Sequence, residues 1–241
     1  MFFTQTKKLS LLLASITILT LSGCNNSSDK KAVVIVPPPA PTPIVYSYEV
    51  TLVNLTQGQP MSPAAVILHN GGQLWKIGES ASTSLEKLAE SGDNSAVLAD
   101  TMVLAGQGGA GILLPGASET ITLSISDTQP MMLSLAAMLV NTNDAFTGVN
   151  AMQLSNMAMG DKVSFTTSTY DAGTEQNSEM MATIPGPAAG GEGFNAERDD
   201  IDKVSMHAGI VSKDDGLMQS ALTQAERFDN PTLMVTITRT K

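Results

Sequence analysis

Short runs in which apolar and polar residues alternate recur between residues 46 and 239, and each run predicts a β-strand. The first run, Tyr46–Asn54, and the last, Thr232–Arg239, are also rich in the β-branched residues that strands favour. Such a series of short strands separated by turns predicts an all-β protein with an antiparallel sandwich, although the pattern fits a jelly roll equally well. The other expected strands are 64–69, 119–126, 131–140, 149–154 and 163–169.

One region breaks the strand pattern and predicts a small helical insertion. Thr83 and Glu86 have the spacing of a capping box, and Ser91-Gly92 supplies a C-terminal cap. A second helix is expected to begin at Asn94 or Ser95 and to continue to Met102. The fold class that follows is an antiparallel sandwich carrying this insertion.

Two connecting segments in the middle of the chain predict different local structures. The four residues Asp127–Pro130 join two predicted strands and favour a β-hairpin between them. Earlier, Gly106–Gly111 matches the G-x-G-x-x-G pattern of dinucleotide-binding loops, which requires a helix directly afterwards. The segment Ile112–Gly116 contains a Pro-Gly pair that breaks a helix, so the glycines predict a flexible loop instead.

The N-terminal residues have the order of a bacterial export signal. Lys7 and Lys8 precede the apolar run Leu9–Leu21, which is too short to span a membrane. The run ends in Leu-Ser-Gly-Cys24 and resembles a lipobox, which implies cleavage after residue 23 and acylation of Cys24. An ordinary signal followed by a buried free cysteine is the alternative. If the source is Gram-negative, the residue Asn25 after the cysteine implies the outer membrane.

Residues 24–45 are expected to form a tether ahead of a single domain at 46–241. Five prolines lie within Val36–Pro43 and favour an extended polyproline conformation. The formal net charge of −10 argues against nucleic acid as a partner, because nucleic acid requires clustered Lys and Arg. The single cysteine excludes an internal disulfide.

Oxygen-bearing side chains gather where two predicted strands end. Asn141, Thr142, Asn143 and Asp144 follow one apolar run, and Tyr170–Glu175 follows another. Carboxylate and amide oxygens suit Ca²⁺, which takes 6–8 oxygen ligands. Asn and Asp in such places also stabilise ordinary turns, and the residues alone leave both interpretations open.

The two stretches NTNDAFTG (141–148) and YDAGTE (170–175) resemble signature segments of the spondin N-terminal domain family known from F-spondin and mindin. The order NLTQGQPMSP, helix, GDNS and the later segment Arg227–Pro231 resemble the same family, where an Asp-Trp pair often stands at Asp144-Ala145. The resemblance implies a C2-like β-sandwich with a calcium site near one end of the strands.

The same resemblance implies that Asp144 and Asp171 are calcium ligands. It also implies a third ligand, a Glu within a preceding strand, but the matching position here is Ser124. The nearest carboxylates are those of Glu119 and Asp127, and a ligand set that lacks one charge is expected to bind calcium more weakly.

No enzyme motif such as H-E-x-x-H or G-x-S-x-G occurs, and His69 and His207 lack a flanking acid–base pattern. The expectation is therefore a non-enzymatic, calcium-binding module for adhesion or recognition. It would be lipid-anchored in the cell envelope, periplasmic or surface-facing, with an extracellular or envelope protein or glycan as partner. The alternatives are a structural envelope lipoprotein without a ligand and a hydrolase with an unrecognised site.

Overall fold

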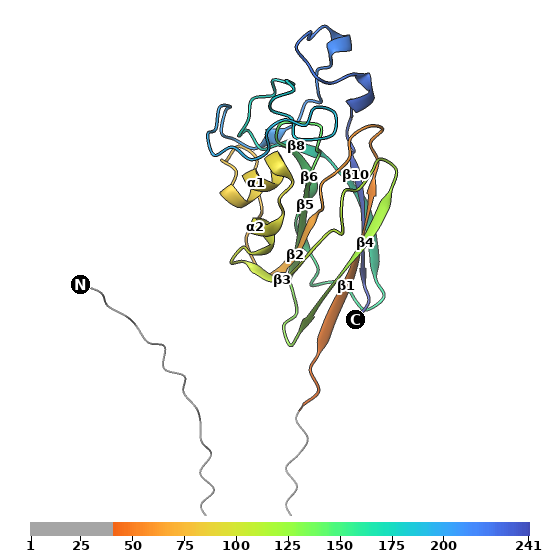
Figure 1. Ribbon diagram of the computed structural model, residues 1–241. Coiled ribbons are helices and arrows are strands. Elements are labelled where there is room, and N and C mark those ends of the chain that lie inside the picture. The colour runs from red at the N-terminus through yellow and green to blue at the C-terminus, as the bar shows by residue number, and fades with distance from the viewer. Residues whose placement is uncertain (1–40) are drawn as a thin grey trace, which may run out of the picture. The chain divides into compact units, whose positions relative to one another are not determined.

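Two antiparallel sheets make up the protein in a computed structural model that describes residues 41–241 (Figure 1). The expected signal sequence, Cys24 and most of the tether lie outside the described residues. Within residues 41–241, no helix has the length and apolar character needed to cross a membrane. The architecture is the predicted all-β sandwich with a small helical insertion.

The first and last strands of the domain lie side by side in a four-stranded sheet of order β4-β1-β10-β7. Val50 of β1 is paired with Ile121 on one side and Ile237 on the other, and all three side chains face the core. On the solvent side of this sheet, hydroxyls bond in pairs across the strands, as in Thr51 with Thr120 at 2.8 Å. The strands are β1 (Val45–Asn54), β4 (Ser118–Ser126), β7 (Lys162–Thr167) and β10 (Leu233–Arg239).

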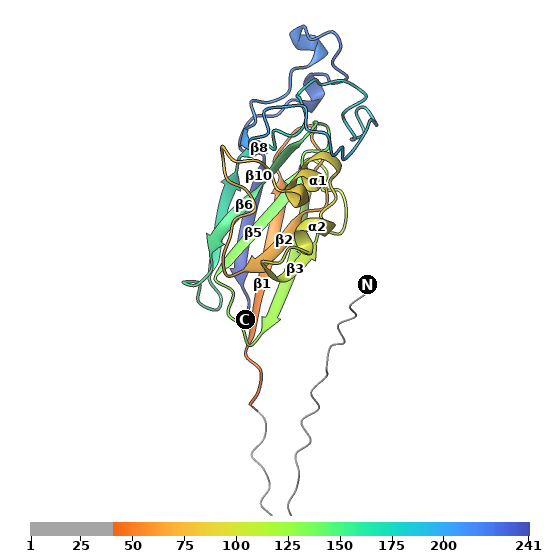
Figure 2. The ribbon, with the colours of Figure 1, turned by 90° about the vertical axis from the view of Figure 1, so that its left-hand side faces the viewer.

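The second sheet has six strands in the order β3-β2-β5-β6-β8-β9. Its inner face packs against the first sheet, and the helices α1 (Thr83–Ser91) and α2 (Ser95–Leu98) cover its outer face (Figure 2). Every residue of β2 is therefore buried, which explains the apolar run 65–68 ahead of the buried, hydrogen-bonded His69. The strands are β2 (Ala65–His69), β3 (Val103–Gly108), β5 (Met132–Met138), β6 (Ala145–Gln153), β8 (Thr169–Asp171) and β9 (Ser205–Met206).

Both helices start close to where the sequence predicted, and α1 also ends there. The α1 cap is Ser82 rather than Thr83, and its hydroxyl accepts a hydrogen bond from the Leu85 amide at 3.2 Å. Gly92 ends the helix in the left-handed region at φ 71°. The second helix is shorter than predicted, because the chain turns after Leu98 and enters β3.

The predicted hairpin through Asp127–Pro130 is wrong. β4 pairs with β1, whereas β5 pairs with β2 and β6, so this segment crosses from one sheet to the other. Asp127 adopts a positive φ of 60° at the crossing, and its amide donates to the carbonyl of Ile44. A local pattern of two strands and a turn does not show whether the strands belong to one sheet.

The predicted flexible loop at Gly106–Gly111 is also wrong in its first half, because Gly106 and Gly108 belong to β3. A Cβ atom on Gly106 would lie 3.1 Å from a methyl of Leu98, and one on Gly108 would lie 3.0 Å from the Asn94 amide. Glycine thus accommodates the close approach of α2 to the strand.

The run predicted as one strand at 163–169 changes sheets at Ser168. Its first part is β7 and its last residue starts β8, which pairs with the first residues of β6. This switch places Asp171 opposite Ala145, next to Asp144. The loops of this region gather at one end of the sandwich, whereas the start of β1 and the C-terminus lie at the other (Figure 1).

Candidate cation site

Asp144 is held inside the protein by the tight loop between β5 and β6. The Thr142 hydroxyl donates to the Leu139 carbonyl at 2.6 Å and accepts from the Ala145 amide at 3.1 Å. One Asp144 oxygen, Oδ2, accepts from the amides of Thr174 and Glu175 and from the Thr174 hydroxyl, at 2.8, 3.2 and 3.2 Å. The other oxygen, Oδ1, is buried and has no hydrogen-bond partner.

Asp171 stabilises the turn that carries these amides. Its Oδ1 accepts from the Gly173 amide at 2.7 Å and its Oδ2 from the Asn177 side chain at 2.5 Å. Gly173 has φ 69°, and a Cβ there would lie 2.3 Å from the Lys203 carbonyl, so the turn requires glycine. The two aspartates thus have the predicted turn chemistry, and they also lie together as the family resemblance implied.

Buried oxygens without hydrogen-bond partners concentrate around Asp144. Six buried side-chain polar atoms lack a partner in the described residues, and four of them are carboxylate or amide oxygens of this region. Buried polar groups are normally paired, so this concentration of unpaired oxygens makes the region the candidate site for a cation. The four atoms are Glu90 Oε1, Asn143 Oδ1, Asp144 Oδ1 and Glu175 Oε2.

The carboxylates in this region influence one another electrostatically. Burial raises the pKa of Asp144 well above its ordinary value, and the neighbouring charge of Asp171 raises it further. Burial, followed by the charges of Glu90 and Asp144, raises the pKa of Glu175 to about 8. A positive charge among these groups would favour their ionised forms.

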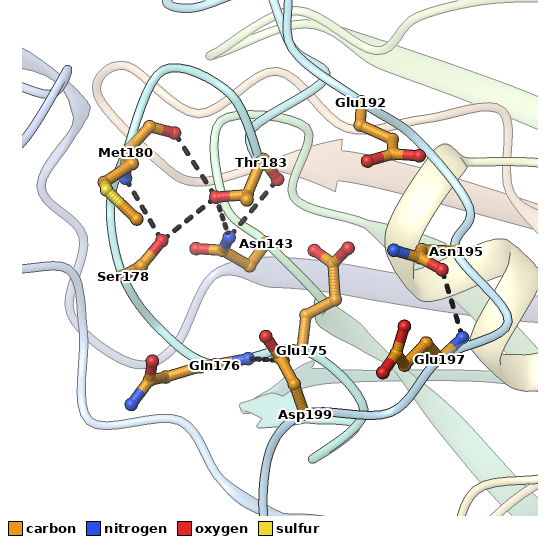
Figure 3. Close-up of a pocket in the computed structure, with 10 residues that line it drawn as sticks. All are labelled: Asn143, Glu175, Gln176, Ser178, Met180, Thr183, Glu192, Asn195, Glu197 and Asp199. Carbon is orange, nitrogen blue, oxygen red and sulfur yellow. Dashed lines mark hydrogen bonds between the residues drawn. The ribbon is translucent and has the colours of Figure 1, made fainter.

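A small pocket connects this cluster to the surface. It has a volume of about 100 Å³, and Asn143 and Glu175 both line it (Figure 3). Its other polar walls come from the loop after β8, including Glu192, Asn195 and Asp199. The pocket therefore lies beside the two residues that carry unpaired buried oxygens, Asn143 and Glu175.

Glu119 and Ser124, the other predicted ligands, are not brought to Asp144. Both lie on β4 in the opposite sheet, where Ser124 bonds to Ser47 and Glu119 accepts from the amide of Ala110. The strand that precedes β6 in the sheet and in the sequence is β5, and it contains no carboxylate. The alternative Asp127 accepts from the Ile44 amide at the crossing between the sheets.

As the side chains stand, no group of three His, Cys, Asp or Glu residues in the described part of the chain is arranged to hold a metal ion. Buried carboxylates without a counter-charge repel one another, so a bound cation would have to draw them together. The donor set nevertheless fits a hard cation, because every unpaired atom in the cluster is oxygen.

Neither histidine belongs to the cluster of four unpaired oxygens, but only His69 lies in another part of the fold. His69 is buried and bonds through its ring nitrogens to Gly71 O at 2.8 Å and Ser134 Oγ at 2.9 Å, so both ring nitrogens have protein partners. His207 follows β9, which pairs with β8, and so lies near Asp171. Its Nδ1 accepts from the Gly209 amide, its buried Nε2 has no hydrogen-bond partner, and burial lowers its pKa whereas the charge of Asp171 acts in the opposite direction.

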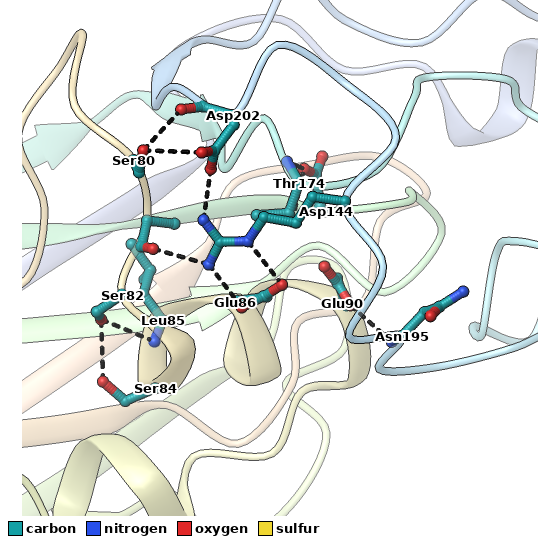
Figure 4. Close-up of polar contacts among 12 residues, drawn as sticks. Ser80, Ser82, Ser84, Leu85, Glu86, Glu90, Asp144, Thr174, Asn195 and Asp202 are labelled. Carbon is teal, nitrogen blue, oxygen red and sulfur yellow. Dashed lines mark hydrogen bonds and ion pairs between the residues drawn. The ribbon is translucent and has the colours of Figure 1, made fainter.

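Sequence reasoning missed two residues of this region, Glu90 and Arg198. Arg198 lies in the long loop between β8 and β9 (residues 172–204) and bonds to Glu86 of α1. Glu90, one helical turn after Glu86, accepts from the Asn195 amide of the same loop (Figure 4). The sequence signal for these residues was the spacing of Glu86 and Glu90, because helical residues four apart lie on the same side of a helix. Two acids on one side of a helix that was expected to pack against the protein were the feature to notice.

Comparison with known families gives one match. The family model described as Spondin_N matches residues 62–186, which is just over half of the chain. The match includes α1, the loop with Asp144 and the turn with Asp171 and Glu175. A search of curated proteins finds no match.

Proposed function

The chain belongs to the Spondin_N family, which indicates an extracellular or envelope-associated module of the adhesion type, and we propose that it binds Ca²⁺ at the end of the sandwich that carries Asp144. The observation that carries the proposal is the set of buried, unpaired oxygens around Asp144. Asp144, Asp171 and Glu175 would supply charge and Asn143 an amide oxygen. Calcium would connect the loop before β6 to the turn after β8.

The proposed role is binding rather than catalysis. Asp144 is fully buried and Glu175 is 7% exposed, so neither carboxylate is presented to a large substrate. A calcium ion there would instead fix the conformation of the surrounding loops, which form the surface of this end of the domain. An extracellular or envelope protein or a glycan would then bind to that surface.

Calorimetric titration of the calcium-free protein tests this proposal. We expect one bound Ca²⁺ per chain and a loss of affinity of at least tenfold in Asp144→Asn, because one ligand charge is removed. The matched control is Glu179→Gln, which removes a carboxylate that is 2% exposed and bonds to the Val211 amide. A wild-type protein that binds no calcium at millimolar concentration would contradict the proposal and leave a spondin-type sandwich with a structural role.

We also propose that Cys24 carries the lipid anchor and that residues 24–45 tether the domain. The chain enters the domain through β1, whose first residue lies at the end of the sandwich opposite the cation site (Figure 1). A tether attached there would allow the cation site to face away from the membrane.

Metabolic labelling with radioactive palmitate tests the anchor. We expect label on the wild-type protein and none on Cys24→Ala, because the chain has no other cysteine and processing requires this one. Asp144→Asn is the control and should be labelled normally. Label that persists on Cys24→Ala would contradict the lipobox interpretation.

A further inference from the structure

Helix α1 buries two glutamates that have opposite electrostatic environments. Glu86 and Glu90 lie one helical turn apart and are 3% and 1% exposed. Arg198 binds both oxygens of Glu86, with Nε–Oε1 at 2.9 Å and Nη2–Oε2 at 2.6 Å. Glu90 forms no ion pair with any Lys or Arg of the described residues.

Only one of the Glu90 oxygens has a hydrogen-bond partner. Oε2 accepts from the Asn195 amide at 2.9 Å, whereas Oε1 is buried and unpaired. The neighbouring Thr174 hydroxyl does not satisfy it, because that hydroxyl has a single hydrogen and donates it to Asp144 Oδ2. A buried carboxylate without a counter-charge is strongly unfavourable, so its retention here requires an explanation.

The position of Glu90 provides that explanation. Thr174 lies between Glu90 and Asp144, and the next residue, Glu175, has its own unpaired buried oxygen (Figure 4). The unpaired oxygen of Glu90 is therefore at the edge of the cluster already described for Asp144. It reaches the cluster from the helical insertion and not from either sheet.

We propose that Glu90 is a further carboxylate ligand of the cation at this site. The inference rests on the proposed calcium binding. Glu90 would supply from α1 the negative charge that the sequence lacks at Ser124. With Asp144, Asp171 and Glu175 it gives four carboxylates around one ion, so a divalent ion leaves a net negative site.

Two properties follow from a ligand set of this charge. A hard trivalent cation compensates four carboxylates better than a divalent one, so Tb³⁺ is expected to bind more tightly than Ca²⁺. Since Glu90 also accepts from the Asn195 amide, the bound cation would hold the loop around Asn195 against α1.

Terbium luminescence is the experiment that tests Glu90. The ring of Trp75, the only tryptophan, lies 5.1 Å from that of Tyr170, the residue before Asp171, so both aromatics are close to the site and can sensitise a bound Tb³⁺. In Glu90→Gln we expect the affinity for Tb³⁺ and Ca²⁺ to fall at least tenfold and the preference for Tb³⁺ to shrink. Glu179→Gln should change neither value.

Glutamine keeps an oxygen that can accept from the Asn195 amide, so a merely structural Glu90 would leave both affinities unchanged in Glu90→Gln. That result would overturn the inference, provided that Asp144→Asn still loses the ion. Wild-type protein that binds neither ion would overturn the proposed function as well. Glu90→Asp keeps the charge but shortens the side chain, and weaker binding in this folded variant would support direct ligation.

Discussion

Calcium is expected to raise the melting temperature of this protein by about 5–10 °C when present at a hundredfold excess over its Kd. Asp144 and the segment 171–175 meet only in the folded protein, so calcium bound there stabilises the native state alone. The gain is about 2.7 kcal/mol at this excess. For a domain of this size, each kcal/mol corresponds to roughly 2–4 °C. Differential scanning calorimetry with calcium and with a chelator measures the difference.

Substitution of the aspartates distinguishes between two roles for them, as cation ligands and as turn-stabilising residues. In Asp144→Asn the calcium-dependent increase should disappear, while the chelated protein should be as stable as the wild type or slightly more so, because repulsion between carboxylates is relieved. The double variant with Asp171→Asn should gain no more from calcium than either single variant. Equal losses with and without calcium would identify Asp144 as a turn residue only.

The pH dependence of the chelated protein follows from the raised pKa values. Glu175 has a folded-state pKa of about 8, above the ordinary value of 4.5, so the folded protein holds protons that the unfolded chain releases. The pKa of Asp144 is shifted in the same direction. Their contribution to stability is therefore present near pH 4.5 and is lost as the pH rises towards 8.

We accordingly expect a lower melting temperature at pH 8 than at pH 5.5 in chelator. Calcium should reverse this trend, because it binds the deprotonated carboxylates and its stabilising effect grows with pH. Equal melting temperatures across this range in chelator would contradict the raised pKa values.

Much of the fold could be predicted from local patterns in the sequence. The alternation in Tyr46–Asn54 and Thr232–Arg239 identified β1 and β10, because each strand has one face in the core and one in solvent. The predicted capping residues placed the two ends of α1 to within one residue of their observed positions. The oxygens of Asp144 and Asp171 were identifiable because strand ends bring polar side chains into loops.

The errors have a common physical origin in contacts between distant segments. The sequence around Asp127 contains a good turn, but β4 pairs with β1, whose residues lie 65 to 81 positions earlier in the chain. The glycines of β3 are explained only by the approach of Leu98 and Asn94. Likewise, a glutamate on a helix resembles a solvent-exposed residue until the long loop covers it, and so Glu90 could not be assigned to the cluster.

Arg198 connects the long loop to α1, and substitution of Arg198 is expected to have a large effect on the stability of the protein. Besides binding Glu86, Arg198 donates to the Ala81 carbonyl at 2.9 Å and forms an ion pair with Asp202. Arg198→Ala would leave the carboxylate of Glu86, whose side chain is 4% exposed, buried without a counter-charge. We expect a loss of roughly 2–3 kcal/mol, below the range for fully buried pairs because the Arg198 side chain is 23% exposed.

The chain offers a matched control in Arg227, which forms an ion pair with Asp215 at 2.8 Å but has a side chain that is 50% exposed. Arg227→Ala should leave the melting temperature nearly unchanged, because solvent screens exposed pairs. Adding Glu86→Gln to Arg198→Ala should restore part of the lost stability, since the uncompensated charge is removed. If Arg198→Ala melts like Arg227→Ala, the ion pair does not hold the loop.

If the loop does detach in Arg198→Ala, limited proteolysis should cut between residues 186 and 204. Calcium affinity should fall in the same variant, because Asn195 would no longer orient Glu90.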